Sequence, residues 1–153
     1  MTHAPLSTRR YSATQLRLLA VSLPAVALTR LALWVLPSTT LVRAARRLES
    51  GAVVRPVRAA VHDVTWAIAA ASRLVPRASC LTQALAGLVM LRRNGHDAQL
   101  CIGAGRDRQG EFRAHAWLEQ GGRILLGGGD LRDLVRFPTL GSTRPAEGVR
   151  THR

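Results

Sequence analysis

The sequence predicts an α+β protein in which helices come first and a small antiparallel sheet follows. Apolar residues recur at helical spacing up to about residue 93 and alternate every second residue beyond residue 97, which is typical of strands. The length of 153 residues suits one domain, and the apolar fraction of 47% is enough to form a hydrophobic core. We therefore expect one folded unit in which helices pack against the sheet.

Four helices are expected before the sheet, and they cover residues 13–35, 39–49, 56–74 and 80–93. Ser38 or Thr39 suits the cap of the second helix, which closes near Gly51. Pro56 suits the first turn of the third helix, because that position needs no amide proton. An Asn-Gly pair directly after residue 93 favours the end of the fourth helix.

Three strands are expected to form an antiparallel meander, and they cover residues 98–102, 111–119 and 123–126. Glycine-containing segments separate these strands, as turns between strands require. Residues 1–12 and 141–153 are polar and show no apolar periodicity, so we expect both ends of the chain to be frayed.

The charge of the chain is strongly positive. All 22 basic residues are arginine, and the formal net charge is +13. Such a charge attracts nucleic acid, anionic membrane or an acidic peptide, or it reflects a solvated basic surface. Nucleic acid is not expected as a partner, because aromatic residues are only 4% and neither a helix-turn-helix motif nor a base-stacking platform accompanies the charge. A basic, non-enzymatic binding module is the alternative function that the charge suggests.

The most hydrophobic segment runs from Leu18 to Leu36, and Pro24 and Arg30 interrupt it. A spanning helix needs about 20 largely uncharged residues. We therefore expect a buried or surface-docked pair of helices here, with peripheral membrane contact as the alternative. The segment lacks the charged start and small-residue cleavage site of a secretion signal. A cytoplasmic protein with two reduced cysteines is expected.

Cys80 is the first candidate for chemistry, because it opens the fourth expected helix. Free N–H groups and the helix dipole at a helix start favour a thiolate. Arg77, three residues earlier, adds positive charge nearby. The competing interpretation is a small, buried, apolar cysteine.

His115 is the second candidate and lies on the middle expected strand. Alternation places Arg113, His115, Trp117 and Glu119 on one face of this strand. The apolar residues Phe112, Ala114, Ala116 and Leu118 lie on the other face, which we expect to pack on the core. A strand histidine alone is often structural. A cysteine that opens a helix, followed by a strand that bears a histidine, is however the order that a nucleophile and its general base require.

A third group would orient the imidazole ring. Asp130 is the chosen carboxylate, because it follows the triple glycine 127–129 and lies fifteen residues after His115. Asp133 is the alternative, and Asp130 has a competing role as the cap of a turn. If neither aspartate serves, the site is a cysteine–histidine dyad, or a backbone carbonyl or Glu119 orients the ring.

The remaining candidates are expected to be structural. Cys101 lies between apolar residues in a strand, His96 lies in the loop from helix to strand, and His62 lies on the third helix. No standard zinc spacing groups Cys80, His96, Cys101 and His115, and no lysine follows the triple glycine as in a phosphate-binding loop. We expect neither a metal nor another cofactor.

Four stretches together resemble the stand-alone, transglutaminase-like leader peptidases of lasso-peptide biosynthesis. They are Cys80-Leu81-Thr82-Gln83-Ala84-Leu85-Ala86, Leu91-Arg92-Arg93-Asn94-Gly95-His96, Ile102-Gly103 and Ala114-His115-Ala116-Trp117-Leu118-Glu119. The resemblance covers about residues 57 to 130. It implies a transglutaminase-like or papain-like cysteine protease core with a Cys–His–Asp triad. The family usually places its acid about twelve positions after the histidine, where this chain has Gly127.

The resemblance also implies a substrate and partners. The implied reaction removes the leader from a ribosomally made lasso-peptide precursor, before an asparagine-synthetase-like cyclase closes the macrolactam ring. Some members carry a fused winged-helix domain that recognises the leader, and the helical start of this chain implies a separate recognition protein instead. The alternative enzyme is another cysteine–histidine acyltransferase or amidase of the same fold.

The expected organisation has three parts. Residues 1–55 form an N-terminal helical extension, residues 56–140 form the protease core, and residues 141–153 form a disordered tail.

Overall fold

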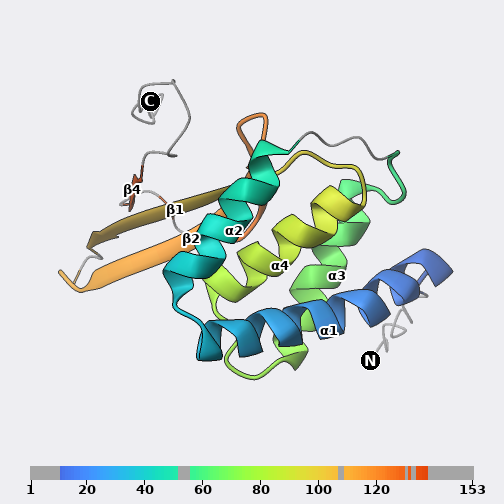
Figure 1. Ribbon diagram of the computed structural model, residues 1–153, viewed down its shortest axis with the longest axis horizontal. Helices are drawn as coiled ribbons and strands as arrows, with labels where there is room; N and C mark the ends of the chain where they lie inside the picture. The colour runs from blue at the N-terminus through green and yellow to red at the C-terminus, as the bar shows by residue number, and fades with distance from the viewer. Residues whose placement is uncertain (1–10, 52–55, 107–108, 130, 132–133, 138–153) are drawn as a thin grey trace, which may run out of the picture.

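The computed structural model describes residues 11–51, 56–106, 109–129, 131 and 134–137. The helices are α1 (Ala13–Val35), α2 (Ser38–Ser50), α3 (Val61–Leu74) and α4 (Cys80–Arg93). The strands are β1 (Gln99–Arg106), β2 (Phe112–Gln120), β3 (Arg123–Leu126) and β4 (Leu134–Arg136). The helices come first and an antiparallel sheet follows, which confirms the predicted α+β class (Figure 1).

The sheet has the strand order β3-β2-β1-β4, with neighbours antiparallel. Its two central strands pair in a register that places Cys101 opposite Trp117 and Gly103 opposite His115. The sequence predicted β1 to β3 but ended β1 too early, at residue 102, since residues 103–105 pair with both β2 and β4. It also missed β4, which pairs with β1. A strand of three residues is too short to show the alternation by which a strand is recognised.

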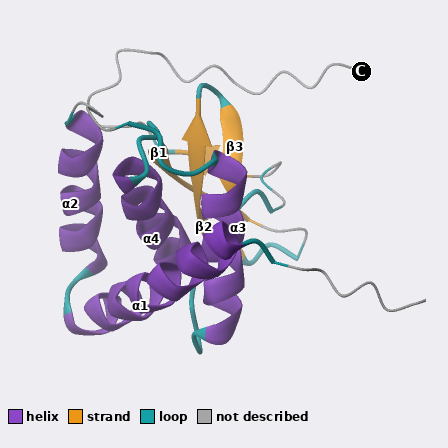
Figure 2. Ribbon diagram, turned by 90° about the vertical axis from the view of Figure 1, so that its right-hand side faces the viewer, coloured by secondary structure: helices purple, strands orange, loops and turns teal. Residues whose placement is uncertain are grey.

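The helices gather on one side of the sheet (Figure 2). The central helix is α4, which packs on β2 and contacts the other three helices. Gly87 lets α4 approach the sheet closely, because a Cβ at this position would lie 2.9 Å from Leu118 Cδ1 and 2.8 Å from Leu126 Cδ2. Ala116 and Leu118 are buried in the same core. The predicted inward packing of β2 is therefore confirmed for Ala116 and Leu118, whereas Phe112 and Ala114, at the start of the strand, are exposed.

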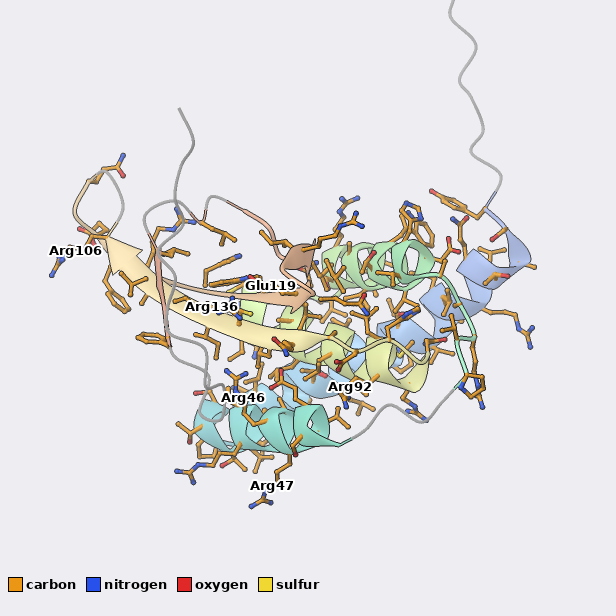
Figure 3. All side chains as sticks on the ribbon, turned by 90° about the horizontal axis from the view of Figure 1, so that it is seen from above. Arg46, Arg47, Arg92, Arg106, Glu119 and Arg136 are labelled. Atoms are coloured by element: carbon orange, nitrogen blue, oxygen red, sulfur yellow. The ribbon has the colours of Figure 1, made fainter. Side chains whose placement is uncertain are left out.

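The first part of β1, which β4 does not reach, is covered by α2. Arg46 donates from Nη1 to the Leu100 carbonyl at 2.7 Å, and the Glu49 carboxylate accepts the Leu100 N–H. Arg46 and Glu49 also form an ion pair with 3.0 Å between Nη1 and Oε2. Figure 3 shows Arg46 directed toward the sheet and Arg47 directed away from it. These contacts occupy the N–H and C=O of Leu100, in the part of β1 that has no strand partner on this side.

The predicted start of the third helix was wrong. Pro56 does not lie in its first turn, because α3 begins at Val61. The residues before α3 bond to the loop between α4 and β1 instead, since the Ala59 carbonyl lies 2.7 Å from His96 Nε2. A contact across the fold thus keeps this segment out of the helix.

The cap predicted for α2 was also wrong. The helix begins at Ser38 with Pro37 in the cap position, so neither Ser38 nor Thr39 supplies a capping hydrogen bond. The predicted ends of α2 and α4 are confirmed by Gly51 and Asn94, which occupy the positions directly after these helices.

Candidate active site

Cys80 is the first residue of α4, as predicted, and it is half-buried with a free thiol. Ser79 caps the helix, because its hydroxyl accepts the Thr82 N–H at 3.2 Å and the Thr82 hydroxyl accepts the Ser79 N–H at 3.3 Å. Arg77, in the turn before the helix, has a left-handed φ of 56°. The first N–H groups of a helix have no partners within it. The positive end of the helix dipole therefore lies at Cys80.

His115 is half-buried on β2, and its ring is held by a backbone carbonyl. The distance from Nε2 to the Gly127 carbonyl oxygen is 2.6 Å. A carbonyl can only accept, so Nε2 carries the proton that it donates to Gly127. In the neutral ring Nδ1 is then unprotonated and free to act as a base.

Gly127 can hold this position only because it is glycine. Its φ is +78°, and a Cβ there would lie 2.9 Å from the Ala116 carbonyl oxygen and 3.2 Å from Trp117 Cα. Gly129 lies nearby as well, since a Cβ at that residue would be 4.0 Å from His115 Nε2. The glycine segment after β3 therefore packs against the histidine, with the Gly127 carbonyl directed at the ring.

A backbone carbonyl as the partner of His115 was one of the alternatives that the sequence left open. No side-chain signal could have selected it, and the spacing of twelve residues from the histidine was the only hint. Asp130 and Asp133, the two predicted carboxylates, both lie outside the described residues. Their part in the site stays a prediction.

The helix that begins with Cys80 and the strand that carries His115 pack against each other (Figure 1). No hydrogen bond joins the thiol to the imidazole ring in the part of the chain that the structure describes. The structure thus makes neighbours of the two elements, and the pairing of the two side chains stays a prediction.

Glu119, another alternative for the third group, has other partners. Trp117 Nε1 donates to its Oε1 at 2.6 Å, and Arg136 Nη1 donates to its Oε2 at 2.8 Å. Figure 3 shows Arg136 and Glu119 next to each other on the sheet. The Glu119 carboxylate therefore joins β2 to β4 rather than orienting His115.

Cys101 lies in this same polar cluster, where Arg136 Nη2 comes within 2.8 Å of its Sγ. The residue is 1% exposed. Burial, and after it the negative charge of Glu119, raises the pKa of Cys101 to about 12. The predicted structural role is confirmed, because a buried thiol with such a pKa stays neutral.

The two other histidines among the described residues also lie outside any candidate site. His96 is buried, and its Nε2 bonds the Ala59 carbonyl, which confirms its structural role. His62 lies in the first turn of α3, with its Nδ1 3.7 Å from Asp63 Oδ1 and its side chain largely exposed. Within the described residues, no group of three or more His, Cys, Asp or Glu side chains could hold a metal ion.

A comparison with protein families gives one match. The sequence profile of the transglutaminase-like superfamily matches residues 23–139, which is more than half of the chain. The match begins inside α1 and includes α4, β2 and the glycine segment after β3. Comparisons with curated proteins and with solved structures gave no match.

Proposed function

Because the chain belongs to the transglutaminase-like superfamily, in which a cysteine serves protease and acyltransferase reactions, we propose that it is a leader peptidase for a lasso-peptide precursor. Cys80 is the nucleophile and His115 the general base. The observation that carries the proposal is the 2.6 Å contact between His115 Nε2 and the Gly127 carbonyl. This contact fixes the tautomer in which Nδ1 can accept a proton.

The reaction follows from these positions. His115 Nδ1 takes the proton of the Cys80 thiol, and Sγ attacks the carbonyl carbon of the scissile peptide bond. The negative charge on the former carbonyl oxygen is favoured near the start of α4, where backbone N–H groups are free. The tetrahedral intermediate then collapses, and the C–N bond breaks as His115 returns the proton to the leaving amine. Water hydrolyses the resulting thioester and regenerates the thiol.

The absence of a thiol–imidazole hydrogen bond between Cys80 and His115 is compatible with this mechanism. Catalytic hydrogen bonds are often long in the free enzyme and tighten when substrate binds. Since α4 and β2 pack against each other, a small movement of either side chain changes the distance between Sγ and the ring. We expect the bound precursor to bring the Cys80 thiol and His115 Nδ1 within hydrogen-bond distance.

Recognition of the leader is expected to require a second protein. We propose that a separate winged-helix protein binds the leader and presents the scissile bond, which raises the rate by proximity. The cyclase that resembles asparagine synthetase would then take the freed core peptide. The net charge of +13 favours an acidic leader or partner.

The test is to incubate the full chain with the precursor encoded beside it, with and without the recognition protein, and to detect the leader by mass spectrometry. We expect slow cleavage by the chain alone and faster cleavage with the recognition protein. Transfer of the acyl group from Cys80 to an added amine rather than to water would identify an acyltransferase instead. Full activity of the isolated chain would contradict the need for a partner.

A further inference from the structure

The outward side of α1 is apolar along the length of the helix. Its exposed large side chains include Leu16, Val21, Leu28, Leu31, Trp34 and Val35, with exposed fractions from 52% to 78%. At 3.6 residues per turn, these positions fall on one side of the helix. Arg17 is the exposed charge on that side between residues 13 and 35. A helix of 23 residues makes this apolar strip about 35 Å long.

The inward side of α1 is apolar as well, since Leu19, Ala25 and Leu33 pack against the core beside its fully buried residues. Its buried residues are Leu18, Ser22 and Val26. The Ser22 hydroxyl has no hydrogen-bond partner among the described residues. A helix on the surface of a soluble domain normally places its large apolar side chains inward. An apolar strip of this length on the outside marks a surface that another apolar body covers.

The charge around α1 indicates what covers it. Residues 1–48 contain seven arginines, at positions 9, 10, 17, 30, 43, 46 and 47, and no aspartate or glutamate. Glu49, the next residue, pairs with Arg46. Seven positive charges and one negative charge therefore give residues 1–49 a net charge of +6, with histidine neutral. An apolar helix face within such a basic segment fits an anionic lipid surface, which offers negative headgroups above an apolar layer.

The helix fits a position in the plane of the membrane rather than across it. It is long and apolar enough to span a bilayer. Its inner side, however, packs on α3 and α4, and Val26 is fully buried there. Figure 1 shows α1 along the outer edge of the helical layer, with α3 and α4 on one side of it. A spanning position would remove this side from the core.

We propose that the outward face of α1 docks the protein on an anionic lipid surface, with the helix lying parallel to the membrane. The leucine side chains enter the boundary between headgroups and acyl chains, and Arg17, which is exposed on the same side of α1, contacts the phosphates. Trp34, near the end of the helix, is 78% exposed. Tryptophan side chains prefer the membrane–water interface, so Trp34 fits this docking. The docking leaves the sheet face away from the helices open.

The test is co-sedimentation of the full chain with vesicles. We expect binding to vesicles of equal parts phosphatidylglycerol and phosphatidylcholine, at least about tenfold weaker binding to phosphatidylcholine alone, and a decrease as salt rises. The double substitution Leu28→Gln with Leu31→Gln should weaken binding to the anionic vesicles about tenfold or more, because two apolar side chains no longer enter the bilayer.

A matched control is the double substitution Phe112→Gln with Val135→Gln. These side chains are 71% and 72% exposed, but they lie on the sheet rather than on α1. The control should bind vesicles as the wild type does. Equal binding by the α1 variant and the wild type would overturn the proposal, and so would a lack of binding to anionic vesicles at low salt. A wild-type dimer that the α1 substitutions dissociate, without vesicle binding, would assign the face to a second copy.

Trp34 gives a second measurement that does not depend on the α1 variant. Its fluorescence should shift to shorter wavelength when anionic vesicles are added, and Trp34→Phe should remove most of the shift. Trp66 and Trp117 remain in that variant and report the rest of the molecule. An equal shift in wild type and Trp34→Phe would contradict docking through α1.

Discussion

Cys80 and Cys101 carry the same side chain in opposite environments. Cys80 is half-buried at the start of α4, where backbone N–H groups lack partners within the helix. Cys101 is buried in the middle of β1, where desolvation first and Glu119 second raise its pKa to about 12. Burial and the surrounding backbone therefore give the same side chain two different environments, and we expect the two thiols to differ in reactivity.

The largest effect that separates the two cysteines is on activity. Cys80→Ala should lower the cleavage rate by more than about a thousandfold, because the nucleophile is lost. Cys101→Ala should keep most of the activity, because this thiol contacts Arg136 and the Gln99 carbonyl rather than the proposed site. Leader release is measured by mass spectrometry, and circular dichroism checks that both variants are folded. The reverse pattern would move the nucleophile to Cys101.

Alkylation compares the two thiols directly. At neutral pH, iodoacetamide should label Cys80 about a hundredfold faster than Cys101, since a buried thiol with a pKa of about 12 is almost wholly protonated. His115→Ala should slow the labelling of Cys80 if the ring accepts the thiol proton. The modified peptides are quantified over time. Equal rates for both cysteines in folded protein would remove the contrast between them.

Gly127→Ala tests the carbonyl that holds the partner of Cys80. The new Cβ would approach the Ala116 carbonyl and move the Gly127 carbonyl away from His115. We expect the turnover rate to fall by about tenfold or more, because the ring loses its fixed tautomer. Gly122→Ala is the matched control, with φ +81° and nothing within 4 Å of the added Cβ. If both variants lose turnover to a similar extent, the effect of Gly127→Ala comes from the strained turn and not from the carbonyl that holds His115.

Asp130→Asn distinguishes the carboxylate that the sequence predicts from the carbonyl that the structure places at the ring. With Nε2 already bonded to Gly127, we expect turnover to fall by less than about tenfold. Asp133→Asn should matter still less. A loss of about a hundredfold or more in a folded Asp130→Asn protein would make Asp130 the third member of a triad and the carbonyl secondary.

The smallest expected effect concerns stability at alkaline pH. The pKa of Cys101 rises from an ordinary value of 9.0 to about 12 in the fold, so the folded state holds the thiol proton more tightly than the unfolded state. This contribution to stability is complete below about pH 9 and is lost as pH rises toward 12. Denaturant titrations measure the free energy of unfolding. Between about pH 9 and 12, this free energy should fall less steeply with pH for Cys101→Ala than for Cys80→Ala. Parallel curves of unfolding free energy against pH for the two variants would contradict this contribution of Cys101.

The sequence predicted the elements around the proposed site more accurately than the contacts between them. Cys80 at a helix start and His115 on the central strand follow from capping residues and from alternation, which are local signals. The start of α3 could not be predicted, because a bond between Ala59 and His96 decides it across the fold. The strand β4 was missed for a similar reason, since its few residues form a strand only by pairing with β1.

By itself, the sequence determined the α+β class, the order of helices and strands, and the positions of Cys80 and His115 in their elements. These features depend on residue spacing and propensity, which any reader of the chain can measure. Only the tertiary structure decided that the Gly127 carbonyl accepts a hydrogen bond from the His115 ring. The same holds for Cys101, whose pKa is raised by burial and by the charge of Glu119. Backbone carbonyls carry no residue identity, and burial is a property of packed neighbours rather than of one position in the chain.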